Sequence, residues 1–160
     1  MTLLPAWAPN FHPLAVHFAI ALLTAAVVVD LVVATLPNRT SAGYVVTWLY
    51  LAGAAAAVIA YFSGERAARS VNLPLEVLPT LNAHADWAFR TTWSFVFFTS
   101  IRLVMSYLRP PTLRTRLCTL VIAVCGFGAL ATTVIHGSRL VFEYGIGVGT
   151  GVKQEREMPE

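Results

Sequence analysis

The sequence predicts an all-α integral membrane protein, an up-down-up-down bundle of four transmembrane helices. Of its 160 residues, 57% are hydrophobic and only 12% are charged, whereas a soluble domain carries about 25% charged residues. The mean hydropathy is +0.68, and four apolar segments approach the roughly 20 residues that cross a bilayer core. Short connections make consecutive helices antiparallel. We therefore expect a single transmembrane domain over residues 1–160.

Prolines, glycines and charged residues separate the four predicted spans. Pro13 fits the first helical position of the first span, where its missing N–H costs nothing. A turn-rich loop follows the first span, and two consecutive prolines follow the third. In chain order, the predicted spans are residues 14–36, 44–62, 83–108 and 117–136.

The remaining segments lie on the two sides of the membrane. Residues 63–82 contain charged residues and prolines, and we expect one or two short interfacial helices there. The tail, residues 145–160, is glycine-rich and then charged, so we expect it to be extended. Both termini share one side, which we call side A, and the loops after the first and third spans lie on side B.

The distribution of basic residues predicts the orientation. The segment before the first span has no Lys or Arg, whereas the short side-B loops contain several. Short loops rich in Lys and Arg are favoured in the cytoplasm, which places side B there. We therefore expect the termini, on side A, to be periplasmic in a bacterial inner membrane. The N-terminus has no basic n-region and no small-residue cleavage site, so a removable signal peptide is not expected.

The chain contains four histidines, and the predicted spans place each of them near side A. They are His12, His17, His84 and His136. A histidine inside a membrane is costly and marks a candidate functional site. Histidines that only link helices through hydrogen bonds would not need to share a depth. Their common depth favours a ligand set, with independent structural histidines as the alternative.

The histidines suggest a haem b site. Two neutral imidazoles on facing elements can ligate a haem iron. We expect His17 and His84 to be the axial ligands, with His136 and His12 as alternates and Arg90 near the propionates. Because His12 precedes a proline, we expect it to lie outside the first helix. Three aromatic residues of the third span are candidates for the wall of the site: Phe89, Trp93 and Phe95.

A metal site competes with haem. His17, His84 and His12, with Glu65 nearby, form a donor set that suits zinc, copper or iron. No HExxH or CxxC motif narrows the choice. Two cysteines, Cys118 and Cys125, would lie about 10 Å apart on one helical face. We expect them to pack as small apolar residues.

Two charged residues, Asp30 and Arg102, are predicted within the membrane toward side B. The interior face of the first span is predicted to follow His17, because the residues at helical spacing from it are small or polar. They are Ala21, Thr24, Val28, Leu31 and Thr35. Asp30 points roughly 140° away from His17 on an ideal helix. We therefore expect Asp30 to extend toward the side-B interface rather than pair directly with Arg102.

Three stretches of the chain together resemble a family of predicted bacterial membrane proteins, "domain of unknown function 2231". They are residues 12–18 (HPLAVHF), 63–68 (SGERAA) and 140–148 (LVFEYGIGV). The resemblance implies four membrane helices, with histidines in the opening motif and at the start of the third helix. His12, His17 and His84 match these positions. Where the family often has a histidine near its C-terminus, this chain has Tyr144, which puts a ligand role there in doubt.

Three functions stay open on the sequence. The first is a haem b-binding protein of electron transfer, which agrees with the family's occurrence beside cytochrome domains. The second is a non-catalytic accessory subunit of a respiratory or photosynthetic complex. The small-residue run 53–57 allows a close approach of the second helix to a neighbour, either inside the bundle or on a partner subunit. The third is a metal-binding or transport protein. We expect membrane lipids and other membrane subunits or a cytochrome as partners. The chain has no basic stripe interleaved with aromatic residues, so we do not expect nucleic acid as a partner. It also has no hydrolase triad, so the sequence gives no sign of such an enzyme.

Overall fold

The computed structural model describes residues 10–35, 40–70, 73–108 and 112–147. Within these ranges the chain is helical and contains no strand, which confirms the predicted all-α class. The elements, in chain order, are α1 (His12–Thr35), α2 (Thr40–Arg69), the 3₁₀ turn η1 (Leu75–Val77), α3 (Leu78–Leu108) and α4 (Leu113–Phe142). Residues 148–160 of the predicted tail and the loop positions 36–39 and 109–111 lie outside the described residues.

The helices are longer than the predicted spans. The N–H of His12 donates to the side chain of Asn10 (3.0 Å), so α1 begins at His12 and not after it. Residues 63–82 were predicted to form short surface helices. This prediction is wrong for most of the segment, because α2 continues to Arg69 and α3 already begins at Leu78.

The end of α4 is defined by a glycine turn. Gly145 has a φ of +65°, which is the left-handed conformation that commonly ends a helix. The N–H of Ile146 donates to the carbonyl of Leu140 (2.9 Å), and this contact satisfies a carbonyl that the last turn leaves free. The helix therefore extends six residues past the predicted limit of 136.

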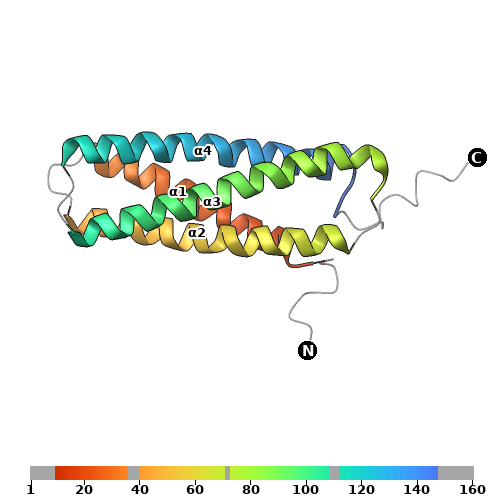
Figure 1. The fold of residues 1–160 in the computed structure, drawn as a ribbon, viewed down its shortest axis with the longest axis horizontal. Helices are drawn as coiled ribbons and strands as arrows, with labels where there is room; N and C mark the ends of the chain where they lie inside the picture. The colour runs from red at the N-terminus through yellow and green to blue at the C-terminus, as the bar shows by residue number, and fades with distance from the viewer. Residues whose placement is uncertain (1–9, 36–39, 71–72, 109–111, 148–160) are drawn as a thin grey trace, which may run out of the picture.

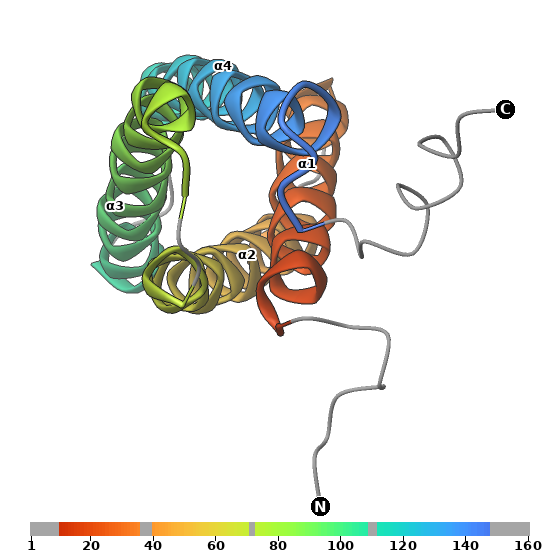
Figure 2. The same ribbon diagram turned by 90° about the vertical axis from the view of Figure 1, so that its right-hand side faces the viewer.

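The four helices lie side by side along the long axis of the molecule (Figure 1). Seen from the end that carries the termini, they occupy four sides of a square (Figure 2). Each helix packs against its two neighbours in the ring, in the order α1, α2, α3, α4. The start of α1, the end of α2, the start of α3 and the end of α4 meet at this end (Figure 1), which is side A.

Small residues and a few aromatics fill the interior, whereas large apolar side chains cover the outside. The buried face of α1 consists of Ala15, Ala19, Leu23, Ala26, Val27, Asp30 and Val33. Tyr50 of α2 and Phe95 of α3 are almost completely buried, at 0% and 1% exposure. The exposed side chains include Phe18, Trp48 and Phe97. An apolar exterior on every helix is the arrangement expected of a protein in lipid.

Three of the four helices are long and apolar enough to cross a membrane. The candidate spans among the described residues are His12–Thr35, Ala42–Arg69 and Leu113–Phe142. The hydropathy of α3 is below that of a candidate span, because the helix contains Asp86, Arg90 and Arg102 together with several hydroxyl-bearing side chains.

The α1–α2 and α3–α4 hairpins repeat the same contacts at an offset of 72 or 73 residues. In the first hairpin, Gly53 of α2 faces the side chain of Leu23 of α1. In the second, Gly126 of α4 faces the ring of Phe95 of α3. Asp30 and Arg102 also occupy equivalent positions, 72 residues apart. The bundle is therefore built from two similar halves.

The small-residue run in α2 packs closely against α1, as residues 53–57 predicted. A Cβ atom at Gly53 would lie 2.7 Å from Cδ2 and 2.9 Å from Cγ of Leu23. Leu23 has no exposed surface and therefore has little room to move. The absence of a side chain at Gly53 sets the distance between the two helices.

We predict that Gly53→Ala lowers the melting temperature of the detergent-purified protein, because the new methyl group forces α1 and α2 apart. Overpacking of this kind costs about 1–3 kcal/mol. Gly128→Ala is the matched control, because a Cβ there meets nothing within 4 Å. An equal melting temperature for Gly53→Ala and the wild type would contradict the close contact.

Candidate functional site

His12 joins the start of α1 to the end of α2. Its Nδ1 lies 3.0 Å from the carbonyl oxygen of Ala60 and 3.2 Å from the hydroxyl of Ser63. The imidazole also packs on Gly64, where a Cβ would lie 2.8 Å from Cε1 of the ring. The predicted position of His12 outside the first helix is wrong, because α1 begins at His12.

His84 makes the equivalent contacts in the second hairpin. Its Nδ1 lies 3.1 Å from the carbonyl oxygen of Thr133 in α4, and its ring packs on Gly137, at 3.0 Å from an ideal Cβ. The glycine follows the bonded carbonyl by four residues in both hairpins. One turn further along α3, the hydroxyls of Thr91 and Thr133 are 2.9 Å apart.

These contacts define the protonation of the two neutral rings. A carbonyl oxygen only accepts hydrogen bonds, so Nδ1 of His12 and of His84 is the donor. In a neutral imidazole the other nitrogen, Nε2, is then unprotonated and free to bind a metal ion or accept a proton. Histidine ligands in metal sites are commonly oriented in this way by a carbonyl behind the ring.

His136 lies next to this pair. It directly precedes Gly137, the residue of α4 on which the ring of His84 packs. The Nδ1 atom of His136 is buried and has no hydrogen-bond partner among the described residues. Since buried polar atoms are normally paired, this atom is an unfilled hydrogen-bonding position at the side-A end of α4.

His17 does not lie with these histidines. Its side chain is exposed, and its Nδ1 bonds the carbonyl of Pro13 one turn earlier in the same helix. The predicted interior face through His17 is therefore wrong. Leu31 is 43% exposed and Val28 is 52% exposed, so this face of α1 lies on the outside of the bundle. The structure does not bring His17 and His84 together.

The remaining side chains predicted around a haem are divided between the two faces of α3. Arg90 is exposed, and its guanidinium stacks over the ring of Trp87 at 5.2 Å. Phe89 and Trp93 are also exposed, at 51% and 41%. Only Phe95 lies inside. The prediction that Phe89 and Trp93 wall the site is therefore wrong.

The predicted three-residue metal site is not formed. Within residues 10–35, 40–70, 73–108 and 112–147, no group of three or more His, Cys, Asp and Glu side chains is arranged to hold a metal ion. The donor set is broken because His17 faces outward and Glu65 pairs with Arg69 on the surface of α2, at 3.4 Å. Cys118 and Cys125 are free and exposed, so they do not contribute to the buried interior.

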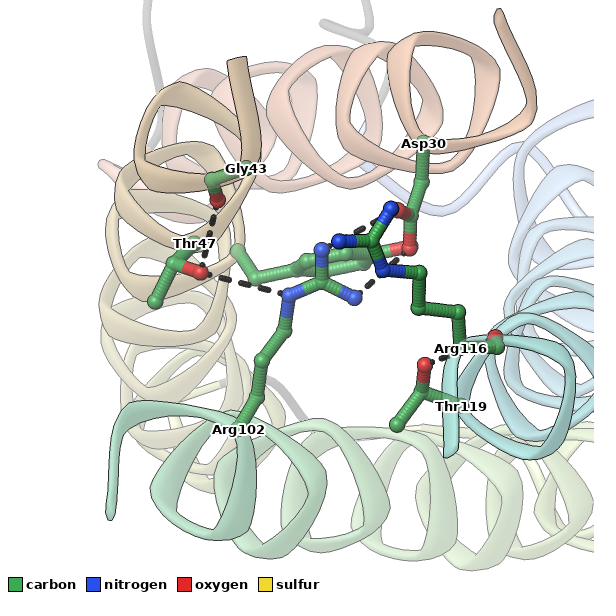
Figure 3. A network of polar contacts seen from close by, with 7 residues as sticks. Asp30, Gly43, Thr47, Arg102, Arg116 and Thr119 are labelled. Carbon is green, nitrogen blue, oxygen red and sulfur yellow. Dashed lines mark hydrogen bonds and ion pairs between the residues drawn. The ribbon is translucent and has the colours of Figure 1, made fainter. Parts of the chain in front are cut away.

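A second polar cluster lies inside the bundle toward side B (Figure 3). The guanidinium of Arg102 binds both carboxylate oxygens of Asp30, at 2.8 and 3.0 Å. Its Nε also donates to the hydroxyl of Thr47 (3.3 Å), which donates to the carbonyl of Gly43. The prediction that Asp30 and Arg102 do not meet is wrong, because Asp30 is on the buried face of α1 that His17 was expected to occupy.

Tyr50 connects the ion pair to the aromatic core. Its hydroxyl donates to Asp30 (3.3 Å), and the guanidinium of Arg102 lies over its ring at 5.3 Å. The same ring packs on Phe98 edge-on at 5.0 Å and is stacked on Phe95 at 6.3 Å. The position of Tyr50 was not predicted, since a lone tyrosine in an apolar segment gives no signal of its own.

The family model for the predicted membrane proteins called DUF2231 matches residues 8–150. The chain belongs to this family. No curated protein and no solved structure matches the chain significantly.

Two of the three stretches on which the family resemblance was based contact each other in the structure, and the third contacts the start of α3. His12 of the opening motif bonds Ala60 and Ser63 and packs on Gly64, and the last two of these residues belong to the second motif. In the C-terminal motif, the hydroxyl of Tyr144 accepts a long hydrogen bond from Thr80 at the start of α3 (3.5 Å). Tyr144 thus connects the chain after α4 to the start of α3.

We predict that His12→Ala lowers the melting temperature, whereas His17→Ala leaves it almost unchanged. The first substitution removes an interhelical hydrogen bond, for which about 0.6 kcal/mol is typical in membranes, and leaves a void beside Gly64. The second removes an exposed ring that bonds only its own helix. Thermal unfolding in one detergent measures both effects, and a larger loss for His17→Ala would contradict the assigned face of α1.

Proposed function

We propose that this DUF2231 protein binds haem b at side A, with His12 and His84 as the axial ligands. The main support for this proposal is that these two imidazoles occupy equivalent positions in the two hairpins. Each is oriented by a main-chain carbonyl at Nδ1 and has Nε2 free. His17, which the sequence favoured as a ligand, has no place in this proposal because its ring faces outward.

The donor set fits such a group chemically. Two neutral imidazoles on separate helices suit a six-coordinate iron, and the buried, unpaired Nδ1 atom of His136 supplies a further polar atom at the same end of the bundle. Bound haem would supply reversible one-electron transfer. His12 and His84 would hold it at one end of the bundle, and the apolar helices around them would exclude water.

The proposal includes an up-down-up-down bundle in which all four helices cross the membrane, α3 among them. At about 1.5 Å per residue, its 31 residues exceed the hydrocarbon core, which is about 30 Å thick. The main obstacle to its insertion is Arg102, whose charge Asp30 compensates. We place the protein in the bacterial inner membrane with periplasmic termini, where it would exchange electrons with a cytochrome or another membrane subunit.

We predict a Soret band and split visible bands of a reduced six-coordinate haem when the protein is purified after haem-replete expression. His12→Ala and His84→Ala should each lose haem or shift the spectrum to a five-coordinate form. His17→Ala is the matched control, since the same residue type is removed five positions away on the outside of α1, and it should bind haem normally.

Two outcomes would overturn the proposal. The first is a wild-type protein that folds as judged by thermal unfolding but shows no Soret band. The second is loss of haem in His17→Ala with retention in His12→Ala. The first result would identify His12 and His84 as residues that connect helices and bind no haem, and the second would show that His12 is not a ligand.

A second candidate function is that of an accessory subunit in a larger membrane complex. It is favoured by α4, only 11% of whose apolar window is buried inside the chain, compared with 39% for α2. The outer surface of α4 includes Gly128, where open space would admit a neighbouring helix. Stoichiometric co-purification with a large complex, without haem bound to this chain, would favour this function.

A further inference from the structure

We propose that the side-B end of the bundle binds a phosphate group between Arg102 and Arg116. Figure 3 shows the side chain of Arg116 extending from the first turn of α4 toward Asp30 and Arg102. The site is at the opposite end of the bundle from the histidines and does not depend on the haem proposal.

The charges of this cluster do not balance. Asp30 is the carboxylate of the cluster, and Arg102 already binds both of its oxygens. Arg116 forms no ion pair within 4.0 Å among the described side chains, although it is only partly exposed. Two guanidinium groups and one carboxylate leave one net positive charge close to the membrane interior, where an unpaired charge is costly.

The repeat of the two hairpins indicates that packing does not require this arginine. The position equivalent to Arg116 in the first hairpin is Gly43, whose carbonyl accepts the hydroxyl of Thr47. In the second hairpin, the carbonyl of Arg116 accepts the hydroxyl of Thr119, which lies three residues further along the chain and not four. At both positions only the main-chain carbonyl of the residue takes part, so the guanidinium of Arg116 makes no contribution to these bonds.

The chemistry of the site favours a tetrahedral oxyanion. A guanidinium presents a planar fork of N–H donors that matches phosphate oxygens. Such a group is available at the surface of a bilayer as the phosphate of an anionic lipid, or in water as inorganic phosphate. Both would place negative charge beside Arg116 without displacing Asp30 from Arg102.

The test measures the thermal stabilisation of the detergent-purified protein by three probes: phosphatidylglycerol, phosphatidylcholine and sodium phosphate at constant ionic strength. An anion that binds only the folded protein stabilises it by RT ln(1 + [L]/Kd), so the melting temperature rises with the logarithm of the ligand concentration above Kd. We expect Arg116→Gln to need roughly tenfold more ligand for the same rise in melting temperature, because one charge-assisted contact is lost. Arg114→Gln, which removes an exposed arginine on the opposite side of the same turn, should match the wild type.

The probes distinguish the source of the phosphate. Stabilisation by phosphatidylglycerol alone identifies a lipid headgroup, and stabilisation by sodium phosphate as well identifies a site open to free phosphate. Equal stabilisation of the wild type and Arg116→Gln, or none of the wild type by either anion, would overturn the proposal. Arg116→Lys distinguishes lost binding from a folding defect. It retains the charge and should recover part of the affinity that Arg116→Gln loses.

Discussion

The ion pair between Asp30 and Arg102 determines how the rest of the bundle is arranged. A charged side chain within a membrane is costly unless a partner compensates it, and these two residues lie on helices from different hairpins. Their contact therefore fixes which face of α1 and which face of α3 turn inward. Because Asp30 follows His12 by 18 residues, as Arg102 follows His84, and 18 residues make five helical turns, the same rotation also turns both histidines inward.

The inward-facing residues at the two ends of the bundle differ in their chemistry. At side A, equivalent residues of the two hairpins have the same chemistry, since both are histidines bonded to a carbonyl of the neighbouring helix. At side B, the equivalent residues have opposite charge and bind each other. Packing of small residues and aromatics lies between the two polar clusters. The fold thus holds two separate polar sites in a chain whose exterior is apolar.

The length and composition of the four apolar segments were sufficient to predict the fold class and the number of helices, although only three of the described helices have the hydropathy of a membrane span. They were not sufficient for the interior face of α1, where alanine, valine and leucine occur on all sides. The face through His17 was selected for its small and polar residues, and this one error also separated Asp30 from Arg102 in the prediction. On α3, the residues that follow His84 at helical spacing are the buried ones, among them Thr91, Phe95 and Phe98. The repeated spacing of His12 to Asp30 and of His84 to Arg102 was the signal that could have identified both faces.

The central claim, that Asp30 and Arg102 bind each other inside the bundle, is tested most directly by a double-mutant cycle. Asp30→Asn, Arg102→Gln and the double variant would be compared by reversible unfolding of the full chain in detergent micelles. Either single change leaves a charge without its partner, at a cost of about 3–5 kcal/mol when the pair is buried. The account predicts that the double variant is more stable than the sum of the two losses implies, by more than about 1 kcal/mol. Additive losses would contradict it.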